Sequence, residues 1–143
     1  MWSHLLRDID KVEGVQRFFT RLLPGLRTLS YPERLQALNL ESLEVRRIFF
    51  DILLLYKMMY GLIDIDFTDF FTINSNNTRG HNLKINVQFS RINYRKYFFI
   101  NRIVNIWNSL PANLVEISSI NVFKQQLKMY DLKVYCRGRA LMT

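Results

Sequence analysis

The stretch that decides the fold is Phe98-Phe99-Ile100-Asn101-Arg102-Ile103-Val104-Asn105-Ile106-Trp107-Asn108-Ser109-Leu110-Pro111. Its apolar residues recur three or four positions apart, the spacing of one helix face, at Phe99, Ile103, Ile106 and Trp107. Pro111 ends the helix, because the residue before a proline is forced out of the helical backbone region. We therefore predict a helix over residues 99–110. Phe98, Phe99 and Trp107 are either core residues, which we favour, or rings that stack on bases.

Immediately upstream, residues 83–89 alternate strictly between apolar and polar side chains. This is the pattern of a strand with one buried face. A second extended segment near Tyr94 to Phe98 can pair with it across residues 90–93. The sequence therefore predicts a small antiparallel β-hairpin before the helix.

Three helices are predicted in the first half of the chain. In the first, over residues 5–23 and ended by Pro24-Gly25, one face is apolar, formed by Leu5, Ile9, Val12, Val15, Phe19 and Leu22. The second is short, runs through Leu38, and begins with a capping box in which Ser30 and Glu33 bond each other's backbone N–H. Ser42 caps the third, over residues 43–60, and Gly61 ends it in the left-handed conformation. Its buried stripe is predicted as Val45, Phe49, Ile52, Leu53, Tyr56 and Met59.

A final helix is predicted from Ser118 or Ser119 to about Lys133, with Val122, Phe123 and Leu127 facing inward. The predicted fold class is therefore mainly α, a small helical domain of about five helices with one short antiparallel β-hairpin. The length of 143 residues and the hydrophobic fraction of 49% suit a single domain over residues 1–143. Within it we distinguish a helical base (1–73), a polar loop (74–82), a basic hairpin with two helices (83–134) and a basic tail (135–143).

The net charge of +8 is unevenly distributed along the chain. Residues 1–77 carry nine Lys/Arg and ten Asp/Glu, whereas residues 78–143 carry eleven Lys/Arg and two Asp/Glu. The excess of positive charge therefore belongs to the second half, which favours a polyanionic partner such as nucleic acid.

Several function classes lack the residues that they need. The chain has one cysteine, Cys136, and two histidines far apart, His4 and His81, so we expect no disulfide, no metal site and no cofactor. We also expect no secretory leader, because Arg7 and Asp8 interrupt the apolar start, and the most apolar stretch, residues 48–60, is too short to cross a membrane. The sequence has no Asp-Asp pair to hold the two metal ions of a polymerase.

Basic residues interleaved with aromatic ones surround the predicted hairpin. The aromatic residues are Tyr94, Tyr97, Phe98 and Phe99, and the candidate nucleic-acid contacts are Arg79, Lys84, Arg91, Arg95, Lys96 and Arg102. Arginine and lysine neutralise phosphates, and exposed rings stack on unpaired bases. His81 is either a phosphate contact beside Arg79 or part of a loop stabilised by its own turn, while Arg17, Arg46 and Arg47 are expected on solvated helix faces or in salt bridges.

The stretch around Trp107 resembles the far C-terminal signature of the reverse transcriptase polyproteins of LINE-type (non-LTR) retrotransposons. Further resembling elements occur in the family's order over residues 2–128, namely Val15-Gln16-Arg17-Phe18-Phe19, Leu29-Ser30-Tyr31-Pro32-Glu33-Arg34-Leu35, Leu43-Glu44-Val45-Arg46-Arg47, Tyr56-Lys57 and Thr78-Arg79-Gly80-His81. Members of this family are RNA-directed DNA polymerases with an endonuclease. The resemblance implies a region downstream of the polymerase motifs, non-catalytic itself, that contributes RNA or template binding to target-primed reverse transcription in the nucleus or cytoplasm.

Two other hypotheses remain. The chain could be a helical protein-interaction or structural module whose basic half meets an acidic partner and that has no nucleic-acid role. It could also be a basic peripheral membrane protein, for which residues 119–133 form a weak amphipathic candidate helix. We favour a nucleic-acid partner, and expect no membrane association.

Overall fold

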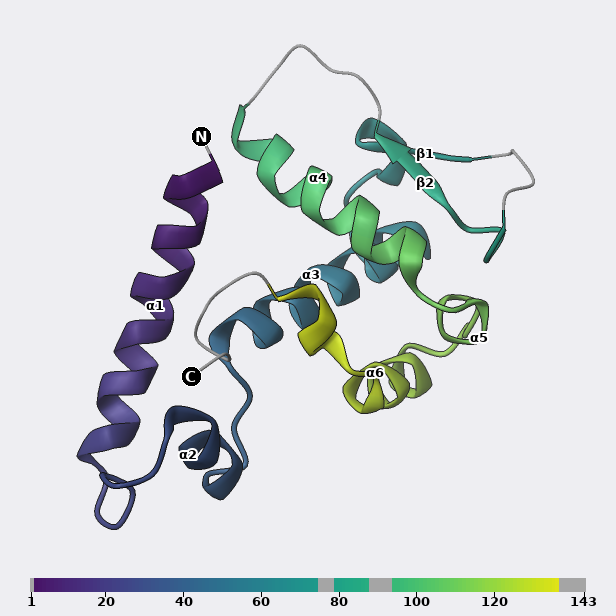
Figure 1. Cartoon of the computed structure of the whole chain (residues 1–143). Helices are drawn as coiled ribbons and strands as arrows, with labels where there is room; N and C mark the ends of the chain where they lie inside the picture. The colour runs from purple at the N-terminus through teal and green to yellow at the C-terminus, as the bar shows by residue number, and fades with distance from the viewer. Residues whose placement is uncertain (1, 75–78, 88–93, 137–143) are drawn as a thin grey trace. The chain divides into compact units, whose positions relative to one another are not determined.

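The helices and the sheet of this chain are seen in a computed structural model that describes residues 2–74, 79–87 and 94–136 (Figure 1). The α-helices are α1 (Trp2–Leu22), α2 (Tyr31–Ala37), α3 (Leu43–Met59), α4 (Tyr94–Ser109), α5 (Ala112–Val115) and α6 (Ile120–Met129). The strands are β1 (Phe71–Ile73) and β2 (Ile85–Val87), and two 3-10 turns, η1 (Phe67–Asp69) and η2 (Leu132–Tyr135), complete the described elements. The predicted fold class, mainly α with one short antiparallel sheet, is confirmed.

The chain divides into two compact units, and the division falls within α3. Unit 1 comprises residues 1–48 and 132–143, and unit 2 comprises residues 49–131. The polar loop predicted at 74–82 lies between β1 and β2 and so within unit 2, because these strands pair antiparallel with Phe71 opposite Val87 and Ile73 opposite Ile85.

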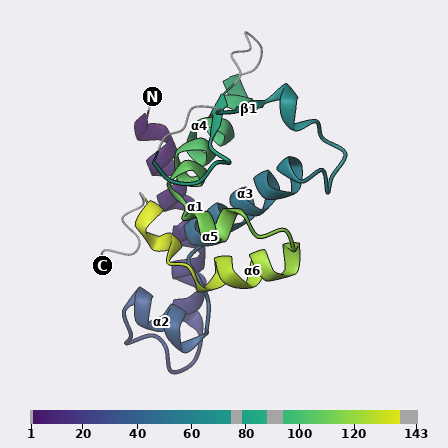
Figure 2. The same cartoon turned by 90° about the vertical axis from the view of Figure 1, so that its right-hand side faces the viewer.

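The partner predicted for the second strand was wrong. Strand β2 pairs with β1, and the segment Tyr94 to Phe98 belongs to α4. Aromatic residues suit either a strand or a helix, and residues 94–98 continue the helical spacing that runs through Trp107, so they extend that helix by its first turn. Both views show the two strands beside α4 (Figures 1 and 2).

Unit 1 is held together by polar side chains on α1. Glu13 is 1% exposed, and its carboxylate accepts from the Tyr31 hydroxyl and from the backbone N–H groups of Leu43 (3.3 Å) and Glu44 (3.3 Å). The Ser42 hydroxyl accepts from the Val45 N–H over 3.2 Å, as its predicted capping role requires. The first turn of α3 thus has its unpaired donors satisfied from α1 and from its own cap.

The predicted helix starts and stops are largely confirmed. In the capping box, the Ser30 N–H donates to the Glu33 carboxylate over 2.7 Å, which lowers the pKa of Glu33 through that bond. Gly61 ends α3 with a φ of +63°, a conformation that glycine adopts at low cost.

The two predictions of buried faces fared differently. The α3 stripe is mostly confirmed, with Val45, Ile52, Leu53 and Tyr56 buried and Ile48, Leu55 and Met58 buried beside them. On α6, Phe123 and Leu127 are buried as predicted, but Val122 is 44% exposed, so its inward placement was wrong. The apolar face predicted for α1 is exposed at Val12, Val15, Phe19 and Leu22, because Glu13, Gln16 and Thr20 on the other side make the contacts to the rest of unit 1.

The core of unit 2 is built on stacked aromatic rings. Tyr56 stacks on Phe123 with ring centroids 4.1 Å apart and on Tyr60 at 4.4 Å. The Tyr56 hydroxyl donates to the Ile117 carbonyl over 2.7 Å, and that of Tyr60 donates to the Val115 carbonyl over 3.1 Å. These bonds join the C-terminal half of α3 to α5 and the segment that follows it.

Three tyrosines make the stability sensitive to alkaline pH. Burial raises the pKa of Tyr31, with a further rise from its bond to Glu13. Burial also raises the pKa of Tyr56 and Tyr60, helped by Tyr60 and by Glu116 respectively. Because the folded chain keeps these protons at a pH where the unfolded chain releases them, the contribution of these three tyrosines to the free energy of unfolding is constant below about pH 10 and falls as the pH rises beyond it.

We expect urea unfolding at stepped pH to show this decline, while the phenolate absorbance of these tyrosines in the folded protein rises only at higher pH than that of free tyrosine. The variant Tyr56→Phe has one such group fewer and should lose less stability over the same pH range. An equal decline in both proteins would contradict this assignment.

Candidate nucleic-acid interface

The six predicted nucleic-acid contacts lie in one stretch without acids. Residues 70–115 contain Arg79, Lys84, Arg91, Arg95, Lys96 and Arg102 and no Asp or Glu. The stretch contains β1, β2, α4 and α5, all of which belong to unit 2. Positive charge in this unit is therefore concentrated in one continuous part of the chain.

The structure places these six residues differently. Arg91 lies outside the described residues, and Arg95 and Lys96 lie in the first turn of α4, where only the backbone is described. Arg79 is exposed, while Lys84 and Arg102 are partly buried. Arg79 is thus the predicted contact whose side chain the structure presents to solvent.

Arg102 has a partner within its own unit. Its guanidinium forms an ion pair with Asp51 on α3, and the two side chains are 20% and 16% exposed. A partly buried pair of this kind joins α4 to α3, and breaking it would leave a charge poorly solvated. An acid of the same chain therefore already neutralises the charge that was predicted to meet a phosphate.

The loop after residue 78 is folded back on itself by Lys84. The Lys84 ammonium donates to the Arg79 carbonyl. Gly80 between them has a φ of +114°, and a Cβ at this position would lie 3.1 Å from Lys84 Cε. The positive φ favours glycine here, and a side chain at this position would also make the end of Lys84 shift.

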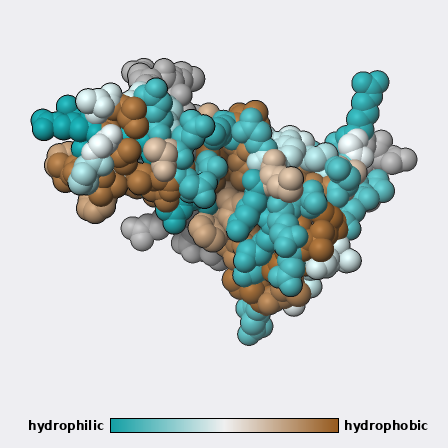
Figure 3. Space-filling view, turned by 90° about the horizontal axis from the view of Figure 1, so that it is seen from below, coloured by the Kyte–Doolittle hydropathy of each residue, from teal (hydrophilic) through white to brown (hydrophobic). Residues whose placement is uncertain are grey.

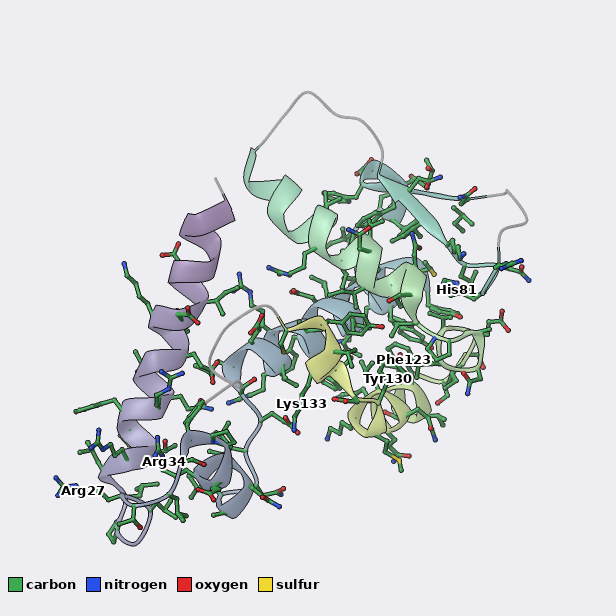
Figure 4. The ribbon with its side chains drawn as sticks, viewed as in Figure 1. Arg27, Arg34, His81, Phe123, Tyr130 and Lys133 are labelled. Atoms are coloured by element: carbon green, nitrogen blue, oxygen red, sulfur yellow. The ribbon has the colours of Figure 1, made fainter. Side chains whose placement is uncertain are left out.

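His81 is a structural residue of this loop. It is 2% exposed, and its Nε2 lies 3.0 Å from the Trp107 carbonyl, at the C-terminal end of α4 (Figure 4). Since a carbonyl oxygen can only accept, Nε2 carries the proton and donates it. Its burial argues against a phosphate contact, and the loop is stabilised by this bond to Trp107 and not, as the other interpretation had it, by its own turn alone.

Trp107 and Asn108, at the end of α4, form hydrogen bonds to the loop before β2 and to β2 itself. Trp107 is fully buried, and its indole N–H donates to the Leu83 carbonyl over 2.9 Å. The side chain of Asn108 accepts from the Ile85 N–H and donates to the Ile85 carbonyl, both at 2.9 Å. Trp107 is therefore a core residue, as predicted, and two motifs that are 26 positions apart in sequence, at His81 and Trp107, form one packed structure.

The charge division along the sequence does not coincide with the division into units. Counted over the full sequence, unit 1 has eleven Lys/Arg and six Asp/Glu, and unit 2 has nine and six. Both units are net positive, because four acids of the first half (Asp51, Asp64, Asp66 and Asp69) belong to unit 2 and three bases of the second half (Lys133, Arg137 and Arg139) belong to unit 1. Unit 1 is thus the more positive of the two in total, whereas in unit 2 six of the nine bases lie in the acid-free residues 70–115.

Two charged residues that the sequence analysis did not single out organise unit 1. Arg34 is 5% exposed, and its guanidinium donates to Thr20 Oγ1 (3.2 Å) and to the carbonyls of Leu29 (2.6 Å) and Arg17 (3.3 Å). Arg34 lies between α1 and α2, whereas Arg27 points away from them (Figure 4). The guanidinium groups of Arg17 and Arg34 also lie over the Tyr31 ring, 5.2 and 5.6 Å from its centroid. The local sequence does not indicate the burial of Arg34 or of Glu13, because charged residues at such helix positions are usually exposed to solvent.

Within the described residues, no group of three or more His, Cys, Asp and Glu is placed to hold a metal ion. None of the helices described is long and apolar enough to span a bilayer. No family model, curated protein or solved structure matches the chain.

Proposed function

We propose that this chain is a non-catalytic region from the C-terminal side of a LINE-type RNA-directed DNA polymerase, where it binds RNA or the template during target-primed reverse transcription. The observation that carries this proposal is the acid-free stretch 70–115 with its six cations, of which Arg102 is paired with Asp51 and the other five remain for phosphate contacts. It is supported by the contact between the two most distinctive resembling motifs, which meet through His81 and Trp107.

The binding that this stretch can provide is electrostatic and tolerant of sequence. Arg79 is exposed, and Arg91, Arg95 and Lys96 follow in a segment free of acids. Each cation that meets a phosphate releases condensed counterions, so the affinity falls steeply with salt. Trp107 is fully buried and therefore cannot stack on a base, so contacts to the phosphate backbone carry the affinity.

A salt titration of RNA binding tests the proposal. The variant changes Arg91, Arg95 and Lys96 together to alanine and leaves Arg102 in place, because that residue pairs with Asp51. We expect affinity at low salt to fall by about 30-fold and the slope of log affinity against log salt to flatten by about 2, as the loss of three phosphate contacts on a single strand implies.

A matched control removes three cations elsewhere. Arg27, Lys124 and Lys128 are exposed and lie outside residues 70–115, and changing them to alanine alters the net charge by the same amount. This variant should keep most of the affinity. Binding that does not depend on salt, or an equal loss in both variants, would refute the proposed site.

A further inference from the structure

One side of α1 carries five large apolar side chains that are more than half exposed. They are Val12 (56%), Val15 (69%), Phe18 (66%), Phe19 (65%) and Leu22 (64%), and we call them the α1 apolar face. Figure 3 shows apolar surface gathered among hydrophilic side chains at its left, where α1 ends and α2 begins. A set of this size on one helix marks an interaction surface.

The polar side of α1 already holds the helix in place. Glu13 accepts from Tyr31 and from the start of α3, Gln16 donates to the Tyr31 hydroxyl over 3.2 Å, and Thr20 accepts from Arg34. The helix is therefore formed before any partner binds, and a partner need not supply the free energy of helix formation.

The spacing of the face matches the seam of a two-helix coiled coil. Val12, Val15, Phe19 and Leu22 follow one another at intervals of three, four and three, which is the spacing of the inward positions in a heptad repeat. A seam of this kind fits a copy of itself. We infer that the α1 apolar face binds the same face of a second copy of this chain as an antiparallel pair of helices.

Charge complementarity decides the direction of the pair. Arg21 is exposed in the last turn of α1, and Asp8 is exposed toward the beginning of the helix. A parallel pair would bring the arginines of both copies together, whereas an antiparallel pair places them near Asp8 of the second copy. It also brings Lys11 beside the last-turn carbonyls of the opposing helix, where the helix dipole favours a cation.

The antiparallel pairing gives a seam of four apolar layers. The two helices would cross near residue 17. Val12 of one copy then lies opposite Leu22 of the other, and Val15 lies opposite Phe19. The two-fold symmetry gives each of these pairs twice. The Phe18 rings of both copies come close to the symmetry axis. Asp8 falls beyond the last layer, so no charge is buried between the helices.

The area available suits a weak but specific dimer. A Phe side chain can bury roughly 200 Å², so the exposed parts of these five residues amount to on the order of 500 Å² per copy. The total of about 1,000 Å² is near the lower limit for a specific interface. We therefore expect a dissociation constant on the order of 10 µM.

Sedimentation of the nuclease-treated chain over a concentration series tests the inference without any variant. A monomer–dimer equilibrium is expected, and nuclease treatment prevents RNA from bridging two copies. Val15→Glu with Phe19→Glu should raise the dissociation constant by about 30-fold or more, because it would bury charges in the seam. Phe50→Glu with Leu54→Glu is the matched control, since these residues are 58% and 38% exposed on α3.

Because all four positions are exposed, circular dichroism should show the same helix content in every variant. A monomer at all concentrations would overturn the inference. A control pair that weakens the dimer as much as the α1 pair would overturn the assignment of the face.

Disulfide trapping tests the direction of the pair. On a Cys136→Ser background, a mixture of the Val12→Cys and Leu22→Cys chains should form a disulfide between the two different chains. Val12→Cys alone should form little. Efficient trapping of Val12→Cys with itself would instead show a parallel pair.

Discussion

Replacing Trp107 with alanine is expected to lower the free energy of unfolding by about 4 kcal/mol. Trp107 is fully buried, and its ring lies against Phe123 and His81, with centroids 6.4 and 6.3 Å away. The substitution leaves a large cavity and also removes the indole donor that the Leu83 carbonyl accepts from. Its cost therefore combines lost apolar burial with an unsatisfied carbonyl.

Urea unfolding followed by circular dichroism measures this loss, and hydrogen exchange should show that residues 79–85 lose protection together with α4. Trp107→Phe retains most of the volume and should cost about half as much. Phe50→Ala is the control, because it removes an aromatic ring that is 58% exposed in the same unit. If Phe50→Ala destabilised the chain as much as Trp107→Ala, the central place of Trp107 in unit 2 would have to be abandoned.

Replacing Glu13 with alanine is expected to cost about 3 kcal/mol. Its buried carboxylate accepts from the Tyr31 hydroxyl and from the N–H groups of Leu43 and Glu44. Alanine leaves these three donors without an acceptor and removes a negative charge from the N-terminal end of α3, where the helix dipole favours it. Through this one side chain, Glu13 joins α1 to α2 and to α3.

The companion variant Glu13→Gln separates charge from shape. Glutamine keeps one oxygen acceptor but turns an N–H₂ group toward backbone donors, so we expect it to recover no more than about half of the loss. Asp8→Ala, at an exposed position on the same helix, should change the free energy of unfolding by less than about 0.5 kcal/mol. A Glu13→Ala chain as stable as the Asp8→Ala chain would show that this carboxylate does not connect the three helices.

The candidate site illustrates where sequence reasoning ends. The positions of the six cations, and the absence of acids among them, are properties of the chain itself. That Arg102 meets Asp51, 51 positions away, depends on how α4 packs against α3. Lys84 was placed on a strand by its pattern, but its ammonium turns back to the Arg79 carbonyl because Gly80 allows the loop to close.

The α1 apolar face also shows what the sequence alone cannot predict. Periodicity correctly predicted a helix with one apolar side, but periodicity alone cannot say which side is covered. In unit 1 the polar side is covered, because Glu13 and Thr20 find buried partners on α2 and α3. The residues within four positions of Glu13 and Thr20 do not indicate that these two side chains are buried against other helices.

The sequence by itself determined five of the described helices, most of their ends, and the second strand, although it placed the start of α4 five residues late and the end of α6 four residues late and did not indicate α5. These features follow from interactions over a few residues, namely the periodicity of apolar side chains, the capping box at Ser30 and the backbone freedom of Gly61. Tertiary structure alone decided that β2 pairs with β1, that Trp107 and His81 close one loop together, and that α1 turns its apolar side outward. Those outcomes depend on contacts between residues far apart in the chain, and burial is a property of the packed structure that a local pattern does not specify.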